Sequence, residues 1–223
     1  MNTHFWQKRR PSAPRVFLRP NLDKIIAAIS FLIKEAEAIG MTPSQYDIGK
    51  SIFMADRSHL NAFGRPITYD NYVAMKHGPV PSLAYDLLKA NTKALREHNI
   101  VALPWKRTDA PKGYFHYSEA RTENVSDVLS PSAMDALSSA LSDVARLSFG
   151  EIRARTHKDP AYTEAWDAVG EKGCNPMSLG LLFNAPNHEA AKAVAFSSKQ
   201  SAATQNVDDE FDIPADLGES AGS

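Results

Sequence analysis

Cysteine is almost absent from this sequence, which has a single one, Cys174, among 223 residues. An intrachain disulfide is therefore impossible, and one thiol does not supply the ligand set of a cysteine-based zinc site. Cys174 lies in a Gly-Cys-Asn-Pro turn, where we expect a surface or partly buried thiol rather than a nucleophile. This cysteine usage favours a reducing compartment, and we expect the protein to be cytoplasmic.

Long hydrophobic runs are also missing. The longest apolar run without a charge spans residues 25–33, about half of the ~20 residues that a membrane-spanning helix needs. The basic N-terminal residues are not followed directly by an apolar stretch. We therefore expect neither a secretory signal nor a membrane segment.

Motifs that carry catalysis are missing as well. The seven histidines are scattered without the H-E-x-x-H spacing of zinc hydrolases, and neither a P-loop nor a dinucleotide-binding fingerprint occurs. His157 and Asp159 stand close together in the sequence, but two ligands do not complete a metal site. We therefore predict a protein that is not an enzyme and that holds no metal and no cofactor.

The net charge is close to zero, at −1 from 25 basic and 26 acidic residues, but the charges are unevenly placed. Residues 1–20 hold five basic groups and no acidic one, whereas residues 207–223 hold six acidic groups and no basic one. The neutral stretch between them argues against a uniformly basic nucleic-acid binder and a uniformly acidic solvating protein. We predict a basic disordered arm over 1–20, one folded domain over 21–198 and an acidic disordered tail over 199–223.

Helical patterns dominate the stretch between the charged ends. Apolar residues spaced three and four apart predict a first helix between a cap at Asn21 and a stop at Gly40. Thr42 followed by Pro43 predicts the start of a second helix, which ends at Gly64. Further helices are expected over about 82–92, from Pro131, from Ser148, from Pro160 and over about 187–198.

Strand-like patterns are few. Tyr72–Met75 is a short strand-like run, and Gly78–Pro81 contains two prolines that exclude a helix interior. Ile100–Leu103 and Tyr114–Tyr117 are predicted to pair as a hairpin across a loop that contains proline and glycine. The fold class that we predict is mostly α, a compact multi-helix domain with a small β-hairpin or short sheet element.

Two polar residues interrupt the apolar face of the second helix. At about 100° per residue, Asp56 and His59 fall near the centre of that face. Because a buried carboxylate is costly without partners, Asp56 must be paired, and Arg65, Lys76 and His59 are the nearest candidates in the sequence. Either the pair fastens the 65–81 segment through its backbone groups, or it forms the floor of a recognition site. A catalytic pair would need further groups, and no nucleophile or ligand motif accompanies this one.

The segment from Lys50 to Ser82 carries a specific series of motifs: Ala-Asp-Arg-x-His-Leu, then Phe-Gly-Arg-Pro-Ile-Thr, Tyr-Val-Ala-Met-Lys and Gly-Pro-Val-Pro. This series resembles the core signature of the Panacea domain, an antitoxin domain whose founding relatives include the SocA-type proteolytic adaptor. A weaker block, from Phe149-Gly-Glu-Ile to Trp166, resembles the C-terminal region of the same family. The resemblance covers roughly residues 22–170.

The resemblance implies a mostly α-helical domain that neutralises a cognate toxin, usually encoded beside it, commonly by direct protein–protein binding. In SocA-type members the domain instead delivers the toxin to a ClpXP-type protease, and the sequence leaves both mechanisms open. The family has no established catalytic residues, so none is carried over. The residues that match its motif become candidates for partner binding: Asp56, His59, Arg65, Tyr72, Lys76, Gly78 and Pro79.

Side chains typical of interfaces gather in the same region. Tyr69, Met75 and His77 accompany Arg65 and Tyr72 there, and aromatic residues, methionine and arginine are enriched at protein interfaces. We therefore add these three residues to the candidates. The alternative interpretation is that Tyr72 and Met75 merely pack the strand onto the second helix.

A DNA-binding regulator is the main alternative function. Residues 22–63 have a helix–turn–helix spacing, and the basic arm could contact phosphates. However, the polar face of the second helix carries only Lys50 and Arg57 as cations, and Asp47 lies in its first turn. We therefore expect a protein partner rather than nucleic acid.

Overall fold

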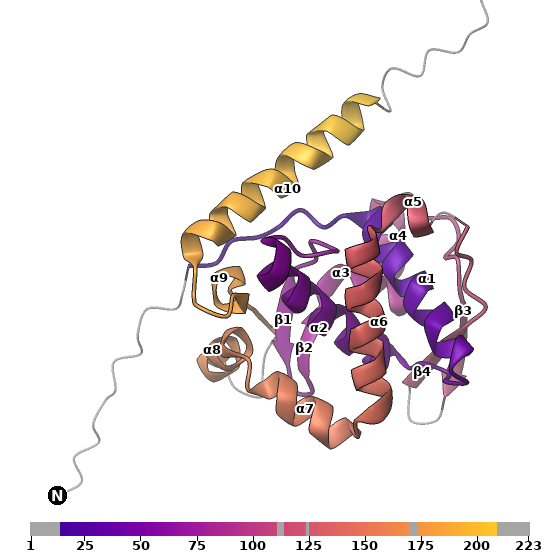
Figure 1. The fold of residues 1–223 in the computed structure, drawn as a ribbon. Helices are drawn as coiled ribbons and strands as arrows, with labels where there is room; N and C mark the ends of the chain where they lie inside the picture. The colour runs from indigo at the N-terminus through magenta and orange to yellow at the C-terminus, as the bar shows by residue number, and fades with distance from the viewer. Residues whose placement is uncertain (1–13, 111–113, 124, 170–173, 209–223) are drawn as a thin grey trace, which may run out of the picture.

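The computed structural model describes residues 14–110, 114–123, 125–169 and 174–208 of the chain. These residues form mostly helix with two small antiparallel sheets, which confirms the predicted fold class (Figure 1). The helices are α1 (Leu22–Ala38), α2 (Gln45–Phe63), α3 (Ser82–Leu88), α4 (Thr92–Glu97), α5 (Val125–Val128), α6 (Pro131–Arg146), α7 (Phe149–His157), α8 (Pro160–Val169), α9 (Leu179–Leu182) and α10 (His188–Asp208). The strands are β1 (Tyr72–Met75), β2 (Gly78–Pro81), β3 (Lys106–Ala110), β4 (Tyr114–Ser118) and β5 (Asn175–Pro176).

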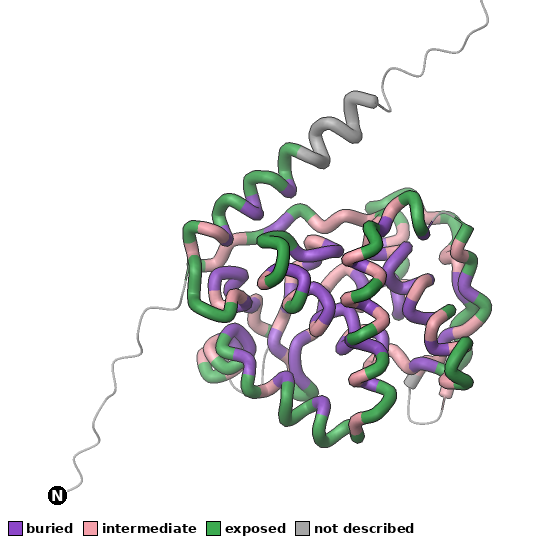
Figure 2. The backbone as a smooth tube through the Cα atoms, in the orientation of Figure 1, coloured by how far each residue is buried: buried purple, intermediate pink, exposed green. Residues whose placement is uncertain are grey.

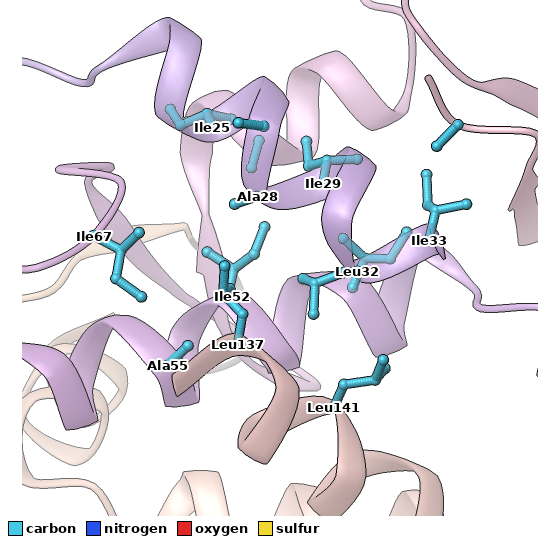
Figure 3. Close-up of a cluster of buried hydrophobic side chains, with 14 of the residues drawn as sticks. Ile25, Ala28, Ile29, Leu32, Ile33, Ile52, Ala55, Ile67, Leu137 and Leu141 are labelled. Atoms are coloured by element: carbon cyan, nitrogen blue, oxygen red, sulfur yellow. The ribbon is translucent and has the colours of Figure 1, made fainter. Parts of the chain in front are cut away.

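Three helices, α1, α2 and α6, pack together around the main hydrophobic core. Ile29 and Leu32 on α1, Ile52 on α2 and Leu137 on α6 meet there with no exposed surface (Figure 3). Full burial of each such side chain stabilises the fold by about 1.5–3 kcal/mol. The apolar spacing that predicted α1 therefore marks its core-facing side, and Asn21 caps this helix as predicted.

Helix α2 begins at Gln45 rather than at the predicted Pro43. Its N-cap is Ser44, which forms a reciprocal capping box with Asp47. The Pro43 carbonyl instead accepts a hydrogen bond from the Tyr117 N–H, which holds this segment extended beside β4. Pairing with a distant strand therefore overrides the local Thr-Pro helix signal.

Strands β1 and β2 form a tight antiparallel hairpin, and β5 pairs with the other edge of β1. The register pairs Met75 with Gly78, so the two residues between them make the hairpin turn. The predicted strand β1 is confirmed, and the proline-containing run that excluded a helix is its partner. Because β2 is an edge strand, Pro79 and Pro81 are tolerated there without N–H groups.

The second sheet pairs β3 with β4, and the predicted partner strand is wrong. Lys106 pairs with Ser118, six residues beyond the start of the expected Ile100–Leu103 strand. Ile100 and Leu103 pack against the main core instead. Strand β3 is a polar, exposed run, so it carries no apolar signal from which it could be predicted.

The helix predicted over 82–92 is interrupted. After α3 ends, Ala90 adopts a left-handed φ of 50°, and the Asn91 side chain then caps α4. Asparagine offers the backbone such alternative hydrogen bonds, which explains the break. The helices predicted from Pro131, Ser148 and Pro160 are confirmed as α6, α7 and α8.

Both ends of the folded body extend further than predicted. Residues 14–20 lie against the body, where Leu18 is buried and exchanges two hydrogen bonds with Asn71. This segment has no helical pattern, but Leu18 joins a second core cluster. At the other end α10 continues to Asp208, ten residues into the predicted tail, and projects beyond the body (Figure 1). The remainder of both predicted charged ends lies outside the described residues.

Buried residues concentrate in the middle of the body, where α2 contacts α1, α6 and β2 (Figure 2). Helix α2 is therefore the element that positions the hairpin. Within the described ranges, no helix is long and apolar enough to cross a membrane. Cys174 is exposed, as predicted.

Candidate functional site

The turn between α2 and β1 is fastened to α2 by Asp56. Its Oδ1 accepts the backbone N–H groups of Ile67, at 2.8 Å, and Thr68, at 3.0 Å. Its Oδ2 accepts the hydroxyls of Tyr72, at 2.8 Å, and Thr68. None of these four donors is a cation. The predicted partners Arg65, Lys76 and His59 are therefore wrong.

The network around Asp56 fixes the shape of the turn. Burial raises the pKa of Asp56 above its usual value. The hydrogen bonds from the four donors lower this pKa, but their effect is smaller than that of burial. Burial, followed by the charges of Asp56 and Asp70, raises the pKa of Tyr72 well above its usual value, so its hydroxyl stays protonated and donates. Tyr69, within the turn, has a left-handed φ of 56°, which a bulky residue keeps only where its neighbours hold it.

His59 fastens the start of the same turn. Its Nδ1 lies 2.8 Å from the Arg65 carbonyl oxygen, and it must donate because a carbonyl only accepts. Its Nε2 lies 3.2 Å from Ser132 Oγ on α6, within hydrogen-bond distance. Asp56 and His59 thus bind backbone groups of the 65–81 segment, which confirms the structural interpretation of this pair.

An aspartate that sequence reasoning missed, Asp70, caps α3 from a distance. Its carboxylate accepts the N–H groups of Leu83 and Ala84 at 3.0 and 2.9 Å. Burial raises the pKa of Asp70 to about 7, while the backbone N–H groups lower it. Only an indirect indication of this role was present in the sequence. Because the N-cap residue of α3 is Pro81, whose side chain cannot accept a hydrogen bond, the cap of α3 must come from another residue.

Lys50 is buried, although the helical wheel placed it on the polar side of α2. It is only 2% exposed, because the hairpin covers that side of the helix. Its Nζ donates to the Pro79 carbonyl oxygen at 2.6 Å and lies 5.1 Å from the centre of the Tyr46 ring. No carboxylate among the described residues forms an ion pair with it, and burial lowers the pKa of Lys50 to about 7.

Gly78 lies where the hairpin passes closest to Lys50 and α7. Its φ is +102°, in a region that side-chain-bearing residues rarely adopt. A Cβ atom built there would lie 2.9 Å from Lys50 Nζ and 2.8 Å from Thr156 Oγ1. Both the backbone conformation and the close approach therefore require glycine at this candidate position.

Replacing Gly78 with alanine is expected to lower the free energy of unfolding by about 1–3 kcal/mol. The positive φ strains the backbone of any residue with a side chain, and the new methyl group displaces neighbouring side chains. Urea denaturation measures the effect. Gly49→Ala is the matched control, since a Cβ there meets only Pro81 Cδ at 3.8 Å. Alanine also favours helix over glycine, so the control should be neutral or stabilising. Equal losses in the two variants would contradict this account of Gly78.

Exposed aromatic and cationic side chains surround the hairpin turn. The Phe149 ring, 49% exposed at the start of α7, lies 4.7 Å from the Tyr46 ring and 5.6 Å from the His77 ring, between centroids. Burial lowers the pKa of His77, and the charges of Arg153 and Lys76 lower it further, which places both exposed cations near this imidazole. We call Tyr46, Lys76, His77, Phe149 and Arg153 the hairpin face.

A pocket of about 260 Å³ adjoins the hairpin face. Lys50 and Tyr46 line it from α2, Pro79 from β2 and Tyr85 from α3. Two lining residues, Gln45 and Tyr46, have a buried polar atom (Nε2 and Oη) without a hydrogen-bond partner among the described residues. Burial raises the pKa of Tyr46 to about 12, so its hydroxyl is a donor at neutral pH.

A larger pocket, of about 620 Å³, lies between α2 and the α7–α8 connection. Arg57 donates there to Asp159 at 2.6 Å, and Asp159 also accepts the Ala161 N–H at 2.9 Å. Arg57 is therefore paired within the fold. Across the described ranges, no three or more histidine, cysteine, aspartate or glutamate side chains are grouped so that they could hold a metal ion.

The ten residues selected from the sequence are not equally accessible. Five are buried: Asp56, His59, Tyr72, Gly78 and Pro79. Two are half-buried, Tyr69 and Met75, and three are exposed, Arg65, Lys76 and His77. The structure brings Met75, Lys76 and His77 together at the pocket, whereas Arg65 lies near Lys24.

Three residues of the hairpin face were not predicted: Tyr46, Phe149 and Arg153. Phe149 had one signal in the sequence, because it follows Ser148 at the start of a capped helix whose composition is otherwise mostly polar. Tyr46 and Arg153 had none. They meet only because the hairpin brings the starts of α2 and α7 to one place.

Comparison with known families gives a match. The model of the family described as "Antitoxin SocA-like, Panacea domain" matches residues 48–163, slightly more than half of the chain. Comparisons with the curated proteins and with the solved structures found no match. The matched range contains the Asp56 network, the hairpin and α7.

Proposed function

Because this chain belongs to the SocA-like antitoxin family with the Panacea domain, we propose that it neutralises a cognate toxin by binding it directly. The observation that carries the proposal is the family match, whose range includes every residue of the hairpin face except Tyr46. The proposed role is not enzymatic, and we propose that it is carried out in the cytoplasm, because a single cysteine fits a reducing compartment.

The hairpin face is the part of the surface that we propose meets the toxin. It combines exposed Phe149 with His77, Tyr46 and the cations Lys76 and Arg153, and aromatic residues and arginine are the types that dominate interface energetics. The Asp56 network and the Gly78 contact hold the hairpin in one conformation. A preformed surface loses less entropy on binding, which favours affinity.

The geometry argues against the DNA-binding alternative. Helix α2, which would be the recognition helix, is packed against α1, α6 and β2 and buries residues around most of its circumference. Of the two cations expected on its polar face, Lys50 is buried and Arg57 is paired with Asp159. An isolated 1–64 fragment that bound DNA with a steep salt dependence would reopen this alternative.

Co-expression with the product of the adjacent gene tests the proposal. We expect the neighbouring gene to arrest growth alone and to be tolerated with the wild-type chain. The double variant Phe149→Ala/Arg153→Glu should weaken protection by an amount equivalent to about a tenfold or greater loss of affinity, because it removes an aromatic anchor and reverses a charge. Growth rate over a series of toxin inducer concentrations measures the loss.

Phe196→Ala is the matched control, since Phe196 on α10 is also exposed, at 64%, but lies outside the hairpin face. It should protect like the wild type. Loss of protection in the control but not in the double variant would show that the face is wrongly assigned. Arrest under co-expression of the wild type would contradict the antitoxin role itself.

The adaptor mechanism is separated from direct inhibition by the same assay in cells that lack ClpX. Direct binding predicts unchanged protection and an unchanged toxin level. An adaptor predicts that protection disappears and that the toxin accumulates when the protease cannot act.

A further inference from the structure

The pocket beside the hairpin face contains a buried cation without a counterion. Lys50 is 2% exposed, and its ammonium has one hydrogen-bond acceptor, the Pro79 carbonyl oxygen at 2.6 Å. An ammonium group has three donors, so two remain for another acceptor. The residues that line the pocket include no aspartate and no glutamate. The charge that would complement Lys50 is therefore missing from the pocket.

Two residues that line the same pocket each carry a buried donor. Gln45 Nε2 and Tyr46 Oη are buried, and neither has a hydrogen-bond partner among the described residues. Buried polar groups are normally satisfied, and an orphaned one calls for an explanation. With Lys50, the first two turns of α2 therefore bring three residues with unsatisfied donors to the lining of one pocket, and an anionic acceptor is the group that they lack.

The size and the walls of the pocket restrict what fits. Its volume of about 260 Å³ is below the range of roughly 300–1,000 Å³ that is typical of sites for whole small molecules. Its walls away from Lys50 are mostly apolar, with Pro79, Pro81 and Leu88 among them. A short aliphatic stem that ends in a carboxylate matches both the walls and the donors.

We propose that this pocket receives the carboxylate of a glutamate or aspartate side chain of the partner toxin, with Lys50 as its counterion. This inference rests on the proposed antitoxin function. The acidic side chain would enter beside His77 and Lys76, and the exposed ammonium of Lys76 attracts a negatively charged surface and orients its approach.

Carboxylate binding must be coupled to a proton on Lys50. Burial lowers the pKa of Lys50 to about 7, and a bound carboxylate would raise it again, so binding above pH 7 takes up a proton. The apparent affinity should therefore fall by up to about tenfold per pH unit above pH 7.

The titratable and charged groups around Lys50 are Tyr46 on α2, Lys76 and His77 in the hairpin turn, Tyr85 on α3, and Arg153 and His157 on α7. Both histidines have lowered pKa values, so they are neutral across this pH window.

Propionate, which has the stem and the carboxylate of a glutamate side chain, is the probe for the isolated chain, and propionamide is its neutral control. Amide chemical shifts by NMR should show saturable propionate binding at Tyr46, Lys50 and His77, with propionamide weaker by about tenfold or more. Lys50→Met should abolish the propionate response. Lys34→Met, which removes an exposed lysine on α1, should leave it unchanged. Equal responses to the two probes, or propionate binding by Lys50→Met, would overturn the proposal.

A second experiment measures how well the same two variants protect cells in the co-expression assay. Lys50→Met should protect less than Lys34→Met, and a toxin with one aspartate or glutamate replaced by its amide should reproduce the loss in the wild-type background. If propionate binds but Lys50→Met protects fully, the pocket serves a free carboxylate and the toxin contact is wrong. If propionate binds and even the wild type gives no protection, the proposed function fails while the carboxylate site remains.

Discussion

Replacing Asp56 with alanine is expected to lower the free energy of unfolding by about 3–5 kcal/mol, a large part of the stability of a typical domain. The carboxylate accepts four hydrogen bonds in a buried position. Its removal leaves the N–H groups of Ile67 and Thr68 and the hydroxyl of Tyr72 without an acceptor, and each unsatisfied buried donor costs about 1–3 kcal/mol. Equilibrium denaturation with urea measures the loss.

Asp47→Ala provides the matched control, since Asp47 is an aspartate on the same helix whose role is only to complete a capping box. Its loss should cost about 0.5–2 kcal/mol. The Asp56 variant should also release the hairpin, so backbone amides of β1 and β2 should exchange hydrogen faster than in the control. Similar losses in the two variants would contradict the anchoring role of Asp56.

Replacing Lys50 with methionine is expected to stabilise the protein at pH 7 by about 1–3 kcal/mol, the opposite of the usual effect of a core substitution. The pKa of Lys50 is lowered by burial from 10.5 to about 7, so the folded state binds this proton more weakly than the unfolded state. The charged form therefore costs stability, on the order of 4 kcal/mol at pH 7. Methionine fills a similar space without charge, although the Pro79 carbonyl loses its donor.

The stability difference between Lys50→Met and the wild type should depend on pH, in a direction that follows from the lowered pKa of Lys50. A lowered folded-state pKa means that the stability contributed by neutral Lys50 is present above pH 10.5 and is lost as the pH falls to about 7. The stability of the wild type relative to Lys50→Met should therefore rise by about 3 kcal/mol between pH 7 and pH 10, which removes or reverses the advantage of the variant. Denaturation of both proteins across this range measures the difference, in which the other titrating groups cancel. An advantage that stayed constant with pH would contradict the assignment of a lowered pKa to Lys50.

If Lys50→Met is more stable than the wild type, Lys50 does not serve the stability of the fold, and its role is functional. Functional sites commonly carry such a cost in stability. The carboxylate pocket supplies the reason here, because the same missing counterion that destabilises the free chain is what a partner would provide. Stability and neutralisation should therefore change in opposite directions in Lys50→Met.

Local sequence patterns correctly predicted the structural features that depend only on residues close together in the chain, such as helix ends and the buried face of a helix. Gly64 ends α2 with a left-handed φ of 71°, and Ser148 begins α7 with a capping box, both as the spacing indicated. The burial of Asp56 and His59 also followed from helical geometry alone, since both lie on the apolar face of α2. These features need only a few residues on either side.

Features that depend on distant parts of the chain were not predictable in this way. The partners of Asp56 are backbone donors, whose positions follow from the path of the turn rather than from residue types. The helical wheel gave the direction of Lys50 correctly but not what covers it, since β2 lies over that side of α2. The hairpin face likewise joins residues more than 100 positions apart, such as Tyr46 and Phe149.

Calorimetric titration of the purified chain with the purified product of the adjacent gene measures whether this chain neutralises its toxin by forming a complex through the hairpin face. We expect a saturable complex that Phe149→Ala/Arg153→Glu weakens by about tenfold or more, while Phe196→Ala leaves its affinity unchanged. Absence of binding by the folded wild-type chain, or a complex that the double variant forms with undiminished affinity, would contradict it.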